Sequence, residues 1–152
     1  MLLRTVLAAV FLVVFALPAT ADPLGTGRVA AGRVKVTSGA AFIVRGTSTL
    51  PAKVGDAILE TDSVRTGPDG RIGITLKDDT RVSLGPDSEF RLDRFSYAPG
   101  EGRLALAMQF VKGVAGYISG RIAKLAPNAV KLETPAAIVG VRGTSLAIRV
   151  AS

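Results

Sequence analysis

A two-residue alternation of apolar and polar side chains recurs along this chain and constrains its fold more than any other feature. In the segment 71–76, the apolar side chains of Ile72, Ile74 and Leu76 alternate with polar or small ones. The same alternation occupies four more segments: 81–84, 89–92, 103–110 and 145–150. Successive side chains of a β-strand point to opposite faces, so this period places one row in a core and the next in solvent. The pattern therefore predicts β-strands.

Turn signals separate these segments at short, regular intervals. They are Gly67-Pro68-Asp69-Gly70, Asp78-Asp79, Gly85-Pro86-Asp87 and Pro99-Gly100-Glu101-Gly102. Many short strands joined by tight turns are typical of an all-β sandwich or barrel. We therefore expect one antiparallel β-sandwich of jelly-roll type, with a short β-solenoid as the alternative.

The segment 104–125 is the one place where a helix competes with this interpretation, because it starts with good helix formers. Gly113, Gly116 and Gly120 recur inside it, and each glycine costs about 1 kcal/mol in the interior of a helix. The two-residue period also continues from 114 to 122. The sequence thus predicts two strands joined near Gly113.

The first 21 residues have the parts of a secretory signal peptide. Arg4 precedes an apolar run at 6–17, and the small residues Ala19-Thr20-Ala21 follow. A membrane-spanning helix needs about 20 apolar residues, and this run is shorter. We expect a helical signal peptide at 1–21 that is cleaved before Asp22. The mature protein would then be periplasmic or secreted, with no membrane span.

The remaining chain has the length of one domain, for which we expect a flexible lead-in at 22–32 and a β domain at 33–151. It contains no cysteine, so packing alone must hold it together. The formal net charge of +7 falls to +6 when Arg4 is removed. In an exported protein this charge favours anionic envelope material over nucleic acid. Because the cations are spread evenly, a solvated basic surface is the simplest explanation.

Composition also removes whole classes of chemistry. The chain has no histidine and no cysteine, so it offers neither a Ser-His-Asp nor a Cys-His arrangement. An ordinary zinc site would need the same residue types. No glycine-rich phosphate loop opens a helix, because the pattern predicts no helix in the domain.

Carboxylates remain as candidates for glycoside chemistry or for calcium binding. The candidate carboxylates are those of Asp69, Asp78, Asp79 and Asp87, and each of the four residues falls in a predicted turn. Aspartate is favoured there because it tolerates left-handed backbone angles and bonds neighbouring amides. We expect all four at solvated tips, with Asp78-Asp79 as a dispensable two-residue connection. The sequence therefore predicts no catalytic, cofactor or metal residue, and it assigns no partner-binding residue.

Three ordered segments resemble the FecR domain, the periplasmic module named after the ferric-citrate signalling regulator. They are "VGDAILETDSVRTGPDGRIGITLKDDTRVSLGPDSEFRL", "LALAMQFVKGVAGYISGRI" and "VKLETPAAIVGVRGTSLAIRV". The matching motifs are Gly55-Asp56 with Thr66, the hairpin tip before Thr80, Thr134-Pro135, and Arg142-Gly143-Thr144. The resemblance spans about 33–150. It departs at Asp79, where the family usually has glycine, and at Leu146, where an aromatic residue is common.

The resemblance implies a free-standing form of this module. In signalling members the domain is tethered to a cytoplasmic anti-sigma segment, and only five residues precede the apolar run here. We also expect no small domain after Ser152 of the kind that completes some members. We therefore expect a non-catalytic exported module that recognises a protein partner in the cell envelope, in a signalling or regulatory role. The alternative, which the charge permits, is a binder of anionic glycan or cell-wall polymer.

Overall fold

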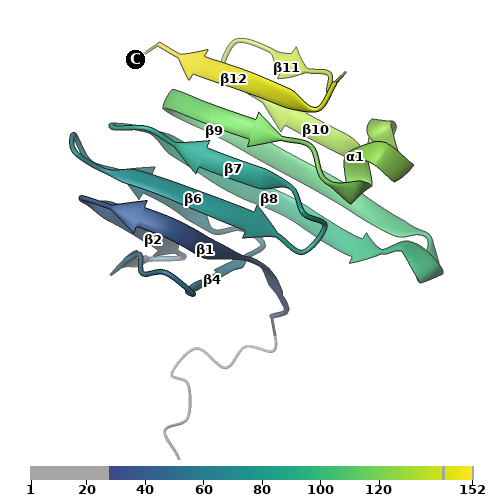
Figure 1. Cartoon of the computed structure of the whole chain (residues 1–152), viewed down its shortest axis with the longest axis horizontal. Helices are drawn as coiled ribbons and strands as arrows, with labels where there is room; N and C mark the ends of the chain where they lie inside the picture. Colours follow the sequence, from purple (N-terminus) through teal and green to yellow (C-terminus); the bar gives the residue numbers. More distant parts are fainter. Residues whose placement is uncertain (1–27, 142, 152) are drawn as a thin grey trace, which may run out of the picture.

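The alternating segments form strands in the computed structural model, which describes residues 28–141 and 143–151 (Figure 1). The predicted signal peptide at 1–21 lies outside the described residues. The strands are β1 (Ala30–Ser38), β2 (Ala41–Arg45), β3 (Ser48–Pro51), β4 (Ala57–Leu59), β5 (Ser63–Thr66), β6 (Arg71–Leu76), β7 (Arg81–Leu84), β8 (Glu89–Ala98), β9 (Arg103–Ile118), β10 (Val130–Glu133), β11 (Ile138–Val139) and β12 (Ser145–Val150). One short helix, α1 (Arg121–Leu125), and two 3-10 turns, η1 (Pro99–Glu101) and η2 (Pro127–Ala129), complete the described part.

The strands form two layers that share β9. Sheet A has the order β4-β1-β6-β7-β9-β12, and sheet B has the order β3-β2-β5-β8-β9-β10-β11. All described strand pairs are antiparallel except β10 with β9. In Figure 1, β1, β6, β7 and β12 lie in front and β2, β8 and β10 lie behind. The prediction of an all-β antiparallel fold of many short strands is confirmed, as one curled sheet folded over itself.

Strand β9 passes from one layer to the other at Gly113. Its first part, up to Lys112, pairs with β8, and its last part pairs with β7 and β12. Gly113 has φ +86, and a Cβ atom there would lie 2.2 Å from Ser88 Oγ and 2.6 Å from the Asp87 carbonyl oxygen. Only glycine fits this bend. The prediction of two strands joined near Gly113 was therefore wrong, because the break is a bend within one strand.

The core lies between the layers and consists of the inward rows of the predicted alternation. Ile72, Ile74 and Leu76 are each 2% exposed. Phe90 of β8 and Phe110 of β9 pack with ring centroids 6.2 Å apart in a tilted arrangement. The period-two interpretation failed over 114–122. Val114 and Ile118 are exposed there while Ala115 and Tyr117 face the core, and Ile122 enters the core from α1 instead of from a strand.

The ordered part of the domain begins before the predicted boundary at 33. Strand β1 starts at Ala30, and Ala31 is buried with its carbonyl oxygen accepting a hydrogen bond from the Lys77 N–H at 2.9 Å. A Cβ atom on Gly32 would lie 2.5 Å from the Thr75 carbonyl oxygen, so β1 and β6 approach closely. Residues 30–32 therefore belong to the sheet, whereas 22–27 of the predicted lead-in lie outside the described residues.

The C-terminal strand β12 has the predicted alternation. All six of its residues pair with β9, from Ser145 opposite Ile118 to Val150 opposite Gly113. Ile148 is buried, and Leu146 and Val150 are partly buried against the core. The strand is thus an integral edge of sheet A.

Candidate interaction surface

The four acidic candidates do lie in turns, but they are not all at the surface. Asp69, Asp79 and Asp87 are exposed, whereas Asp78 is fully buried. Within the described residues, no three or more acidic side chains gather into a group that would hold a metal ion. The prediction that all four occupy solvated tips was therefore wrong for Asp78.

Asp78 is a buried hydrogen-bond acceptor that joins two elements. Its Oδ1 accepts from the Thr80 N–H at 3.1 Å, and its Oδ2 accepts from the Thr80 hydroxyl at 2.7 Å. Oδ2 also accepts from the Ile122 N–H at 3.3 Å, and the Asp78 carbonyl oxygen accepts from the Arg121 N–H at 2.7 Å. The carboxylate thus holds the start of α1 against the β6–β7 turn, and its complete burial leaves no access for a substrate.

The β6–β7 turn differs from the predicted two-residue connection. The Asp79 N–H donates to the Leu76 carbonyl oxygen at 3.0 Å, and the Leu76 N–H donates to the Thr80 carbonyl oxygen at 2.8 Å. This pattern makes a three-residue loop whose last residue, Asp79, has φ +68. The exposed Asp79 carboxylate lies 3.2 Å from Arg121 Nε. The two adjacent acids therefore have unrelated roles.

A second buried carboxylate, which the sequence pattern did not mark, belongs to Asp62. It accepts from Arg45 Nη2 at 2.8 Å, from Arg45 Nε at 3.0 Å and from the Leu59 N–H at 2.8 Å. The hydrogen bond to Asp62 raises the pKa of Arg45 above its usual value. The partners are 17 residues apart and meet only because β2 and β5 pair. This ion pair closes the β4–β5 turn, so it too serves the fold.

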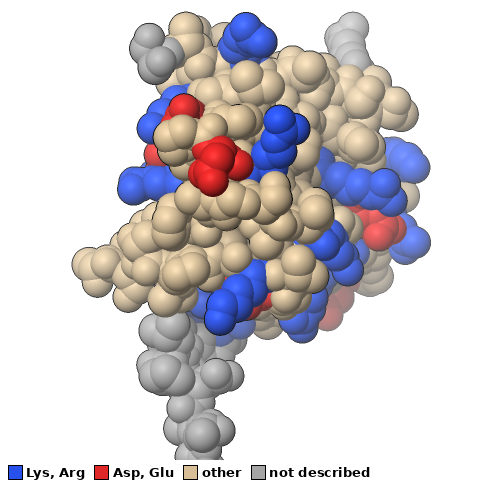
Figure 2. All heavy atoms as spheres, turned by 60° about the vertical axis from the view of Figure 1, so that its left-hand side comes forward, with Lys and Arg blue, Asp and Glu red and all other residues tan. Residues whose placement is uncertain are grey.

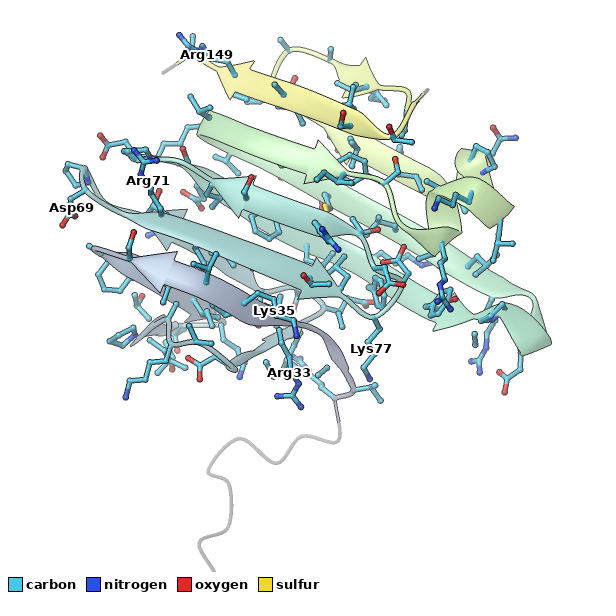
Figure 3. All side chains as sticks on the ribbon, viewed as in Figure 1. Arg33, Lys35, Asp69, Arg71, Lys77 and Arg149 are labelled. Atoms are coloured by element: carbon cyan, nitrogen blue, oxygen red, sulfur yellow. The ribbon has the colours of Figure 1, made fainter. Side chains whose placement is uncertain are left out.

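The charge of the domain is distributed unequally between its faces. None of the sheet A strands contains an acidic residue, and the exposed acids Asp69 and Asp79 lie in the turns at the two ends of β6, whereas exposed cations lie on the strands and beside them. We call these cations the basic face: Arg33, Lys35, Arg71, Lys77, Arg81 and Arg149. In Figure 3, Arg71 and Arg149 lie toward the left-hand end of the sheet, and Arg33, Lys35 and Lys77 lie toward its β1 edge. Among the described residues, none of the six forms an ion pair.

Sheet B is different, because its strands contain acids that neutralise neighbouring cations. Arg65 of β5 lies 3.2 Å from Glu89 of β8, and Lys131 of β10 lies 3.4 Å from Glu133. Arg91 of β8 also pairs with Asp93 on the same strand. The even spread of cations along the sequence thus becomes an uneven distribution of net charge in space.

The middle of the basic face is lined by small residues. Gly73, Ser83, Gly116 and Ala147 are direct neighbours on β6, β7, β9 and β12. Two adjoining hollows of about 580 and 510 Å³ share Gly73, Ser83 and Gly116, together with Val36 of β1. We call this continuous depression, from Val36 to Ala147, the trough. Figure 2 shows Lys and Arg side chains around uncharged areas of the molecular surface, with a few Asp and Glu side chains among them.

Another hollow, of about 490 Å³, lies between the start of β1 and the end of β8. Its lining includes Arg28, Phe95, Tyr97 and Arg103. Its one carboxylate, from Glu60, accepts a hydrogen bond from the Phe95 N–H at 2.9 Å. The hollow therefore combines aromatic and cationic groups without a pair of free acids.

A family model described as FecR protein matches residues 62–152. The chain belongs to the FecR family. Searches of curated proteins and of solved structures found no match. Proteins of this family are signalling and regulatory modules associated with the cell envelope. Within the described residues, no helix has the length and apolar character needed to cross a membrane.

The structure explains two of the FecR motifs. Thr66 is buried, its hydroxyl donates to the Gly85 carbonyl oxygen at 2.6 Å, and its Oγ1 accepts from the Ser88 N–H at 2.9 Å. The second motif, the hairpin tip before Thr80, contains Asp78, whose buried carboxylate makes the hydrogen bonds described above. Arg142 of the third motif lies outside the described residues. The match begins after β4, yet β1 and β2 complete the two FecR sheets beside β6 and β5.

Proposed function

We propose that this FecR module is exported, is not an enzyme, and recognises a protein partner in the cell envelope in a signalling or regulatory role. The observation that carries the proposal is the basic face. Six exposed cations without ion-pair partners repel one another, and an acidic partner would supply the counter-charges that the described residues do not.

The absence of catalysis in this proposal rests on how the acids are used. Asp62 and Asp78 are fully buried and engaged by hydrogen bonds that close turns. Asp79 and Asp87 are exposed at loop positions with left-handed backbone angles. A glycosidase needs two carboxyl groups facing one substrate cleft, and the acids of the described structure are not arranged in this way.

Binding of an anionic glycan is the second candidate, and it is favoured by the hollow beside β8. Phe95 and Tyr97 provide flat side chains for sugar rings there, and Arg28 and Arg103 provide positive charge. The basic face of sheet A has no aromatic side chain pointing outward, because its one tyrosine, Tyr117, is buried in the core. The two candidate functions thus use different surfaces.

The tagged full-length chain, expressed in a bacterial host and recovered from its periplasm, tests the proposal. We expect mass spectrometry to find a mature chain that begins at Asp22. Chemical crosslinking in envelope extract should yield discrete protein conjugates, and the purified protein should not sediment with isolated cell wall. Sedimentation with cell wall that is lost in Tyr97→Ala, together with the absence of protein conjugates, would favour the glycan alternative.

A further inference from the structure

We infer that the trough is the docking site for an extended acidic segment of the protein partner, lying across the strands of sheet A. This inference rests on the proposed function and deepens it, because it assigns the surface and the chemistry of the segment. Three properties of the trough support it: its shape, its charge and the apolar side chains exposed along it.

The shape of the trough suits a single extended chain. Its floor crosses five neighbouring strands, from β1 through β6, β7 and β9 to β12. At about 4.8 Å between strands, the floor is about 19 Å long, which about six residues of extended chain would span. Val36 covers Gly73 at the β1 end, and from there Ser83, Gly116 and Ala147 keep the floor low, so the backbone of a bound segment can approach the sheet closely.

Cations border the trough on both sides. Arg81 stands two residues from Ser83 on β7, and Arg149 stands two residues from Ala147 on β12, on the opposite side of the floor. Arg71 and Arg33 continue the two sides on β6 and β1, and Arg33 also donates to the Gly55 carbonyl oxygen at 3.0 Å. Because no sheet A strand carries an acid, a bound acidic segment would supply the missing counter-charges.

Exposed aliphatic side chains decide between a protein segment and a polysaccharide. Val36, Val114 and Ile118 line the trough and are 60%, 43% and 45% exposed. Large apolar side chains exposed together between cations are typical of protein interaction sites. An acidic segment with interspersed aliphatic residues would cover these three side chains and pair with the arginines. A polysaccharide would instead place hydrated hydroxyl groups against the three aliphatic side chains.

The experiment follows the binding of a labelled synthetic peptide, EVELEV between Gly-Ser flanks, to the full mature chain by fluorescence anisotropy and by NMR. We expect chemical-shift changes on β6, β7, the last part of β9 and β12.

The double variant Arg81→Glu/Arg149→Glu should weaken binding about tenfold or more, since two attractions become repulsions. Salt at about 0.5 M should weaken the wild type similarly. The control Arg94→Glu/Lys112→Glu removes as much charge from sheet B strands and should change affinity less than twofold.

A steric variant separates docking in the trough from unspecific attraction by charge. Ala147→Trp fills the floor without altering any charge, and Ala147 is exposed on an edge strand, so the fold should tolerate it. We expect at least about tenfold weaker peptide binding in this variant, and unchanged binding in Ile138→Trp on β11. Equal affinity of Ala147→Trp and wild type would overturn the inference, as would shift changes confined to sheet B or to the hollow beside Tyr97.

The same variants distinguish failure of this inference from failure of the proposed function. If Ala147→Trp and Arg81→Glu/Arg149→Glu still form the protein conjugates of the wild type in envelope extract, the module recognises a partner but does not use the trough. If a sulfated or carboxylated polysaccharide binds in the trough more tightly than the peptide, the occupant is a glycan and the inference is wrong.

Discussion

Replacing Asp78 by alanine is expected to destabilise the domain by about 3–5 kcal/mol. The substitution removes the acceptor of three hydrogen bonds, from the Thr80 N–H, the Thr80 hydroxyl and the Ile122 N–H. All three donors belong to fully buried residues, and each buried donor left without a partner costs about 1–3 kcal/mol. Since a domain has a margin of only about 5–15 kcal/mol, Asp78→Ala should lower the melting temperature markedly or prevent folding. Chemical denaturation monitored by circular dichroism provides the measurement.

The neighbouring acid provides the matched control. Asp79 is exposed and has a left-handed φ of +68, so Asp79→Gly should leave stability unchanged or raise it by about 1 kcal/mol. Together with a destabilised Asp78→Ala, this outcome would restrict the sequence-based expectation of a dispensable Asp78-Asp79 pair to Asp79. Equal stability of Asp78→Ala and Asp79→Gly would contradict the structural role assigned to the buried carboxylate.

Deletion of residues 145–152 is the second change with a large expected effect. It removes the whole of β12, buried Ile148 and the partly buried side chains of Leu146 and Val150. A fully buried aliphatic side chain contributes about 1.5–3 kcal/mol, so the three together contribute about 4–6 kcal/mol. The deletion would also expose the edge of β9 and the core beneath it. We expect loss of cooperative thermal unfolding in differential scanning calorimetry.

A point substitution tests the same strand with less disruption. Ile148→Ala should cost about 2–4 kcal/mol, because it leaves a cavity at the edge of the core. Ile138→Ala on β11 is the control, since Ile138 is 67% exposed, and its cost should stay below about 0.5 kcal/mol. If the truncated chain melts cooperatively near the temperature of the full chain, β12 is not a structural part of the domain.

The sequence predicted the strands well because period-two alternation follows from the local geometry of a strand, in which successive side chains point to opposite faces. Each inward row, such as Ile72, Ile74 and Leu76, faces a core whatever the order of the strands. The order itself depends on pairings between distant segments. Nothing local indicates that β1 lies beside β6, or that β10 runs parallel to β9. The local sequence also could not show whether Gly113 lies in a turn between two strands or in a bend within one strand, because glycine suits both.

The roles of the acids were harder to predict than the turns that contain them. A turn sequence implies exposure, and that inference holds for Asp79 and Asp87. It fails for Asp78 because α1 covers the tip of the hairpin, and α1 begins 43 residues further along the chain. The short helix escaped detection because Ile118, Gly120 and Ile122 continue the strand period across its start.

The interaction surface could not be predicted from the sequence for a related reason. Cations are spread evenly along the chain, so no segment appears basic. The asymmetry arises only when β1, β6, β7 and β12 bring their cations to one face while the acids of β8 and β10 fall on the other sheet. The FecR resemblance, in contrast, was detectable from ordered short motifs and holds over residues 62–152.

Site-specific photocrosslinking in intact cells tests the central claim most directly. A photoreactive phenylalanine derivative at Ser38, at the border of the trough where it leaves the floor open, is compared with the same group at Thr49, exposed on β3 of sheet B. We expect a discrete crosslinked protein from position 38, with an acidic segment at the crosslinked site, and little product from position 49. Crosslinks from position 49 alone, or none from either position while cell-wall material is labelled, would contradict recognition of a protein partner by this face.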